Sequence, residues 1–152
     1  NRKTLDPIPA SRLIEEARKL VGIPYHHQGR NKFGVDCIGL FVLAFEEAGS
    51  DLVRLLGVRD TRDYGRHRPN PKTLELLEHN LAARLDAPVP GCLIAFRFVP
   101  EVVPRHYGLF TERGTFVHAD GMRKLVCETR YADPWLRRVH SLWRLPGVTY
   151  GA

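Results

Sequence analysis

The sequence lacks long apolar runs and paired cysteine motifs, and each absence excludes a class of protein. Its longer apolar windows, such as residues 38–45, are far below the roughly 18 residues that a membrane-spanning helix needs. Its three cysteines, Cys37, Cys92 and Cys127, form no CxxC pair. An odd number of separate cysteines indicates neither a disulfide framework nor a structural zinc site, so we expect at least one free thiol.

What is present fits one globular domain with a basic surface. The chain has 152 residues, of which 43% are hydrophobic and 26% charged. This length suits a single domain, and this apolar fraction can fill a core and argues against disorder. The net charge of +6 comes mainly from 18 arginines, against 5 lysines. It favours an anionic partner, such as nucleic acid, phospholipid or an acidic cell-wall polymer, without selecting among them.

The first third of the chain carries helical patterns. Residues 1–9, which contain two prolines, are predicted to be an arm or linker before a single domain over 10–152. Apolar residues at helical spacing predict a helix over 13–21, and the glycine-containing stretch 25–35 is predicted to be a loop.

A second helix is predicted to start near Cys37, with Asp36 as its N-cap and Gly49 at its end. An arginine-rich insert of about 50–89 follows. It is predicted to be irregular at first and then helical over 71–81, where an Asn-Pro pair can start a helix.

After the insert the pattern changes to strands, at residues 92–98, 106–111, 115–119, 124–128 and 139–145. Helices followed by a meander predict an α+β fold, in which N-terminal helices pack on an antiparallel sheet of about five strands.

Cys37 occupies the first turn of the second predicted helix. The partial positive charge and unpaired amides of a helix N-terminus lower the pKa of a thiol, which makes a cysteine there a candidate nucleophile. The carboxylate of Asp36 opposes this effect unless it is turned back to cap the helix. The alternative is that Cys37 is a small apolar residue at the start of a buried helix.

A tight hairpin is predicted to bring His106 and His118 together. Residues 112–114 suit a three-residue loop whose final glycine is left-handed. Pairing of Thr111 with Thr115 then places both histidines on one face as diagonal neighbours. A two-residue loop would separate them.

A thiol, a histidine that takes its proton and a polar group that orients the histidine form the general cysteine-nucleophile arrangement. Two histidines on one face, downstream of Cys37, fit this arrangement. Each histidine alone is more simply a surface or hydrogen-bonded strand residue. Cys37, His106 and His118 are also a candidate zinc set, although the usual acidic ligand is missing.

A series of motifs, in the same order along the chain, resembles those of the NlpC/P60 cysteine peptidases, over about residues 10–145. GIPY at 22–25 and DCIGL at 36–40 resemble the family's PY and DCSGL segments. Downstream, PGCLIAF at 90–96 resembles its PGDLVFF strand, HYGL at 106–109 resembles HVGIY, and FVHA at 116–119 resembles FIHA.

The resemblance implies a papain-like fold and a role for each matched residue. Cys37 would be the nucleophile, His106 the general base and His118 the orienting third member. Tyr25 matches a tyrosine beside the family's nucleophile, whose hydroxyl helps to position the substrate or stabilise the oxyanion. Family members cleave stem peptides of bacterial cell walls, commonly between D-γ-glutamyl and a diamino acid, and no cofactor is expected.

The sequence departs from the family pattern at Ile38 and Cys92, where Ser and Asp are usual, and in the long insert. The insert and the closing segment resemble NlpC/P60 proteins of tailed phages and gene transfer agents, in which the peptidase sits at the tail tip and opens the wall. The residues that carry this second resemblance are Tyr64, Pro69, Leu74, 135–138 and 143–146.

Several other polar and aromatic residues have two interpretations. His26 and His27 could line a substrate groove or lie in a solvated loop. The arginines between 54 and 68 could bind stem-peptide carboxylates or lie on the surface. Packing roles are predicted for Cys92, Cys127, Trp135 and Trp143.

We therefore expect a peptidoglycan endopeptidase with a Cys-His-His triad, at the tail tip of a phage-like particle and acting in the bacterial periplasm or cell wall. Its expected partners are stem peptides and other tail-tip proteins, with no nucleic acid and no membrane span. The alternative is a structural tail-tip component that keeps the peptidase fold without cutting.

Overall fold

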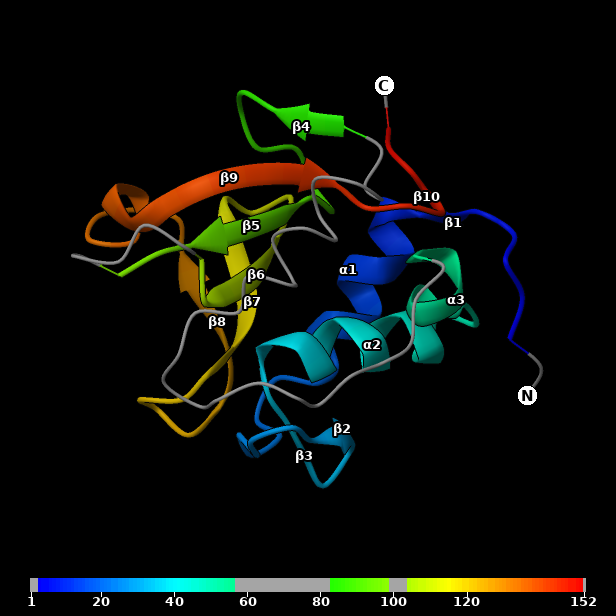
Figure 1. Cartoon of the computed structure of the whole chain (residues 1–152), viewed down its shortest axis with the longest axis horizontal. Coiled ribbons are helices and arrows are strands. Elements are labelled where there is room, and N and C mark those ends of the chain that lie inside the picture. Colours follow the sequence, from blue (N-terminus) through cyan, green and yellow to red (C-terminus); the bar gives the residue numbers. More distant parts are fainter. Residues whose placement is uncertain (1–2, 57–82, 99–103, 152) are drawn as a thin grey trace.

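Six antiparallel strands form the main sheet, in the spatial order β4-β9-β5-β6-β7-β8 (Figure 1). The structure is a computed structural model that describes residues 3–56, 83–98 and 104–151. The strand bounds are Ala83–Leu85 (β4), Leu93–Phe96 (β5), His106–Phe110 (β6), Thr115–Asp120 (β7), Leu125–Arg130 (β8) and Val139–Arg144 (β9).

The five predicted strands are present, with ends that differ from the prediction by no more than two residues. The edge strand β4 was not predicted, because three residues are too few to show an alternating pattern. It pairs with β9 alone, with Ala83 opposite Arg144. The predicted helix over 71–81 lies outside the described residues, as do Arg59, Arg62, Tyr64, Arg66, Arg68, Pro69 and Leu74.

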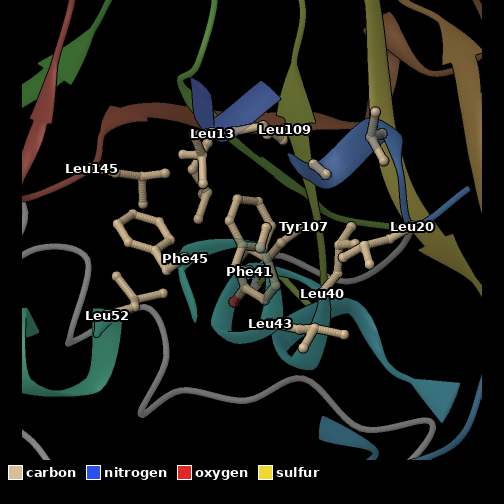
Figure 2. Close-up of a cluster of buried hydrophobic side chains, with 14 of the residues drawn as sticks. Leu13, Leu20, Leu40, Phe41, Leu43, Phe45, Leu52, Tyr107, Leu109 and Leu145 are labelled. Carbon is tan, nitrogen blue, oxygen red and sulfur yellow. The ribbon is translucent and has the colours of Figure 1, made fainter. Parts of the chain in front are cut away.

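Two helices, α1 (Ala10–Arg18) and α2 (Cys37–Glu47), pack on one face of the sheet (Figure 1). Helix α1 contacts β6, and α2 contacts both β6 and β7. Buried side chains from both helices meet Tyr107 and Leu109 of β6 there, as Figure 2 shows. This arrangement confirms the predicted α+β class. No helix within the described ranges is long and apolar enough to cross a membrane.

Two predictions of irregular structure were wrong. The stretch after α2 contains the short helix α3 (Leu52–Leu56), which Asp51 caps by accepting a hydrogen bond from the Arg54 amide at 3.2 Å. The predicted loop over 25–35 contains a small antiparallel hairpin of β2 (Arg30–Asn31) and β3 (Gly34–Val35).

Two short strands, one from the N-terminal part of the chain and one from the C-terminal part, lie side by side. Strand β1 (Ile8–Pro9) pairs in parallel with β10 (Val148–Thr149), and Ile8 is buried. The last residues of the predicted arm are therefore packed against the domain.

The opposite face of the sheet carries a second apolar cluster. It comprises Cys92, Ile94, Phe96, Phe116 and Leu142. Trp135, from the connection between β8 and β9, packs against this cluster. The sheet therefore has a helical cover on one face and an aromatic cover on the other, and the two histidines of interest belong to the aromatic side.

Close packing at Gly39 predicts one stability effect. A Cβ at this position in α2 would collide with the carbonyl oxygen of Gly29, in the loop before the helix. We expect Gly39→Ala to lower the free energy of unfolding by about 1–3 kcal/mol, because the loop must move to admit the methyl group. Chemical denaturation measures the change. Gly151→Ala, where a Cβ meets nothing within 4 Å, is the matched control. Equal stability of the two variants would contradict this packing.

Candidate active site

Asp36 fixes the start of α2 and thereby the position of Cys37. One carboxylate oxygen, Oδ1, accepts hydrogen bonds from the amides of Ile38 at 3.1 Å and Gly39 at 2.8 Å. The side chain therefore satisfies two amides of the first helical turn, which confirms the predicted N-cap.

The same carboxylate also holds the preceding loop. Its Oδ2 accepts from the amide of Gln28 at 2.9 Å, and Arg30 forms an ion pair with its Oδ1 at 3.0 Å. Asp36 is only 1% exposed, so its charge is buried together with the guanidinium that balances it. The carboxylate is thus turned into the cap, and Cys37 is the first residue of the helix beyond it.

The predicted hairpin places the two histidines. Leu109 pairs with Val117 and Phe110 with Phe116, the predicted register, and the loop glycine Gly114 has a φ of +69°. Nε2 of His106 lies 2.7 Å from Nδ1 of His118, with the two rings inclined at 77°. The prediction that this turn would bring the two imidazoles together is confirmed.

A pocket of about 530 Å³ brings three of the predicted residues together. Tyr25, Cys37 and His106 line it, and His118 lies behind His106 with no exposed surface. The thiol of Cys37 donates to the carbonyl oxygen of Arg105, at 4.0 Å, so it meets the backbone beside His106. His26 and His27 are absent from the described residues that line this pocket.

Three further residues complete the surroundings of the histidines. Thr129 Oγ1 lies 2.8 Å from Nε2 of His118, and Cys127 Sγ lies 3.4 Å from the same nitrogen. The ring centre of Trp135 is 5.7 Å from that of His106 and 5.1 Å from that of His118. Cys127 is buried and Trp135 packs against the aromatic cluster, as predicted, and both also contact the histidines.

The register of β7 and β8 could have revealed Cys127, because it pairs with His118. Thr129 was missed because the predicted strand ended one residue before it. Trp135 lies in the irregular connection between β8 and β9, so neither a periodic hydrophobic pattern nor a strand register predicts its position. By contrast, Cys92 and Trp143 are buried packing residues as predicted.

Burial makes the neutral forms of the thiol and the imidazoles the stable ones. Desolvation, reinforced by the charge of Asp36, raises the pKa of Cys37 to about 12. Desolvation and the neighbouring His118 lower the pKa of His106 to about 3, and desolvation lowers the pKa of His118 to about 3. At neutral pH the resting site therefore holds a thiol and two neutral histidines.

The hydrogen-bond chain allows one productive arrangement of protons. If His106 donates from Nε2 to Nδ1 of His118, then His118 carries its proton on Nε2 and donates it to Thr129. Nδ1 of His106 is then left without a proton and can act as a base. In this arrangement the oxygen of the Thr129 hydroxyl is the acceptor, 2.8 Å from Nε2 of His118.

A different set of side chains has the spacing of metal ligands. Ligand atoms of His118, Asp120 and Cys127 lie within 4.8 Å of one another in the described part of the chain. The two nitrogens of His118 already face His106 and Thr129, so a metal here would have to displace one of these contacts. This set shares only His118 with the zinc set considered from the sequence.

A thiol at a helix N-terminus beside a linked pair of histidines is the residue set of a cysteine-nucleophile site. The model of the NlpC/P60 family matches residues 22–144. The chain belongs to the NlpC/P60 family.

Solved structures share the fold at low sequence identity. An NlpC/P60 family protein from Bacillus cereus ATCC 10987 has a TM-score of 0.69 and 18% identity, over 95% of this chain and 42% of that chain. The NlpC/p60 domain of the peptidoglycan hydrolase SagA has a TM-score of 0.60 and 15% identity, over 91% and 100%. The peptidoglycan hydrolase RipB of Mycobacterium tuberculosis has a TM-score of 0.53 and 21% identity, over 90% and 64%.

The chain thus spans less than half the length of the Bacillus cereus protein. No curated protein is significantly similar to it.

The pKa directions predict how Cys37 reacts with iodoacetamide. A thiol whose pKa is raised forms thiolate only as the pH rises, so the alkylation rate should climb through pH 9 and beyond. It should show no plateau between pH 5 and 8. Peptide mapping by mass spectrometry measures the rate at Cys37, and the Cys37→Ala variant shows the background from the two buried cysteines. An inflection below pH 6 would reveal a thiolate–imidazolium pair and contradict the neutral resting state.

Proposed function

We propose that this chain is a cysteine peptidase that cleaves stem peptides of bacterial peptidoglycan. The observation that carries the proposal is the pocket shared by Cys37 and His106, with His118 hydrogen-bonded behind His106. Family membership supports it, as do two similar structures that are peptidoglycan hydrolases.

The arrangement suits a general-base mechanism. Nδ1 of His106 takes the thiol proton while Sγ of Cys37 attacks the peptide carbonyl carbon. The resulting tetrahedral species collapses as His106 gives the proton to the leaving amine, which leaves a thioester on Cys37. A water molecule, activated by His106, then hydrolyses the thioester and restores the thiol. His118 holds the ring of His106 in place and shares the charge that develops on it.

The capping contacts restrict which groups can stabilise the oxyanion. The amides of Ile38 and Gly39 bond to Asp36, which leaves the amide of Cys37 as the helix donor. Tyr25 lines the pocket together with Cys37 and Gly121. We assign its hydroxyl the role of a second donor to the oxyanion or of a substrate contact.

We further propose that the peptidase acts at the tail tip of a phage-like particle, on the cell wall of the bacterium that the particle enters. The support is the sequence resemblance of the insert and of the closing segment, which begins at Trp135. Immunogold labelling of purified particles tests this location. Gold at the tail tip is expected, and label confined to host cells would contradict it.

A structural tail-tip component without activity is the second candidate. One observation favours it: the thiol of Cys37 donates to a backbone carbonyl, and burial raises its pKa to about 12. A neutral thiol is compatible with catalysis only if His106 removes the proton as the substrate binds.

Substitutions at the three residues separate these candidates. Cys37→Ala should abolish muropeptide cleavage, by about 10⁴-fold or more, because no other group supplies the nucleophile. His106→Ala should be nearly as damaging. His118→Ala should retain some activity, because His106 can still take the proton without its orienting partner. Digestion of purified muropeptides with mass spectrometry of the products measures each rate.

Exposed His26 provides the matched control, since it lies in the loop before Cys37 and does not line the pocket. His26→Ala should cleave at the wild-type rate. Wild-type turnover by the Cys37→Ala variant would contradict the proposed mechanism. Absence of cleavage by the wild-type chain, with the fold intact, would support the structural candidate.

A further inference from the structure

Two arginines of the active-site pocket take no part in the mechanism above. Arg105 and Arg138 line the pocket with Cys37 and His106. Their guanidinium carbons lie 4.8 Å and 5.3 Å from the centre of the same ring, that of Phe98. Arg138 also lies 5.1 Å from the ring centre of Trp135. Both guanidinium groups therefore lie close to the ring of Phe98 at the pocket.

The described lining of this pocket includes two basic side chains and one acidic side chain. Asp120 is the acidic residue among the described residues that line it, and its Oδ1 accepts from the amides of Met122 and Arg123. Within the described ranges, the partners of the Arg138 guanidinium are the rings of Phe98 and Trp135, and no carboxylate pairs with it.

Stacking on aromatic rings holds a guanidinium group by its face and leaves its N–H edge directed outward. That edge matches the two oxygens of a carboxylate and can bind them with parallel hydrogen bonds. Arginines held in this way are prepared to bind an anion before it arrives, which lowers the entropy lost on binding.

The two charges also lie next to the reacting groups. Arg105 precedes His106 in the chain, and its carbonyl oxygen accepts from the Cys37 thiol. The ring centres of Phe98 and His106 are 6.3 Å apart, and Trp135 contacts His106 as well as Arg138. An anion bound here would belong to a substrate residue close to the scissile bond.

We propose that Arg138 forms a carboxylate-binding subsite that selects stem peptides with a free carboxylate beside the scissile bond. This inference rests on the proposed peptidase function and names the substrate feature that the same pocket recognises. Two carboxylates of a stem peptide could supply the group: the α-carboxylate of the D-glutamyl residue and that of the diamino acid.

The electrostatics of His106 support a link between binding and catalysis. The charge of Arg105 adds to burial and to His118 in lowering the pKa of His106. A bound carboxylate would offset that charge and make the imidazole a better base when the substrate is in place. The resting thiol would then lose its proton mainly in the substrate complex.

Three synthetic stem peptides test the subsite: one with both carboxylates free, one amidated at the D-glutamyl α-carboxylate, and one amidated at the diamino acid. For the wild-type chain we expect amidation of one of the two carboxylates to lower kcat/KM by about 10- to 100-fold, because the substrate then loses a charge-assisted pair of hydrogen bonds. Whichever amidation causes the loss identifies the bound group.

Arg138→Ala should lower kcat/KM for the acidic peptide by a similar factor and leave the amidated peptide unchanged, so that the preference disappears. Arg138→Lys should keep part of the preference, because a point charge replaces the planar donor. Arg137→Ala is the matched control, since the Arg137 side chain is 76% exposed and pairs with Asp133. It should keep the full preference.

Binding to the Cys37→Ala variant separates the subsite from the peptidase activity. Titration calorimetry should show the acidic peptide binding at least 10-fold more tightly than the sensitive amidated peptide, with the difference lost when Arg138→Ala is added. If this difference is seen but the wild-type chain cleaves nothing, the proposed function fails and the subsite stands. Equal binding of the three peptides, or an equal loss for all three in Arg138→Ala, would overturn the subsite.

Discussion

The buried carboxylate of Asp36 is the interaction on which the active site depends. One side chain joins the first turn of α2 to the loop before it, through the amides of Ile38 and Gly39 and the guanidinium of Arg30. Removing it would leave helix amides unsatisfied and take away the carboxylate that balances the buried guanidinium of Arg30, each of which is costly. The position of Cys37 is therefore set by a polar network, while the apolar core behind α2 sets only the position of the helix.

Cys37 and His106 reach the pocket from different layers of the fold. Cys37 comes from the helical layer, whereas His106 and His118 come from strands whose side chains join the aromatic cluster around Phe96, Phe116 and Trp135. These rings exclude water from the imidazoles, and exclusion of water makes charge unfavourable there. The same packing that aligns His106 with His118 therefore keeps the resting site neutral, so that deprotonation of the Cys37 thiol depends on substrate binding.

Local rules predicted the central features of the site. The capping preference of Asp36 and the loop 112–114 depend on a few neighbouring residues, so the helix start and the hairpin register could be read from the sequence. The matched motifs extended this to roles for Cys37, His106 and Tyr25. The sequence could not indicate Trp135 or β4, because each is placed by contacts with distant strands rather than by its own pattern. The stacking of Arg105 and Arg138 on Phe98 likewise depends on contacts between segments that are separate in the sequence.

A covalent intermediate on Cys37 is the most direct consequence of this geometry. Mixing the chain with a stem peptide, quenching in acid before the first turnover is complete and measuring the intact mass would detect it. The account predicts a mass increase equal to the acyl fragment, mapped to Cys37, together with release of the amine product in the same phase. Release of the amine product without any adduct, or an adduct at Cys92 or Cys127, would contradict it.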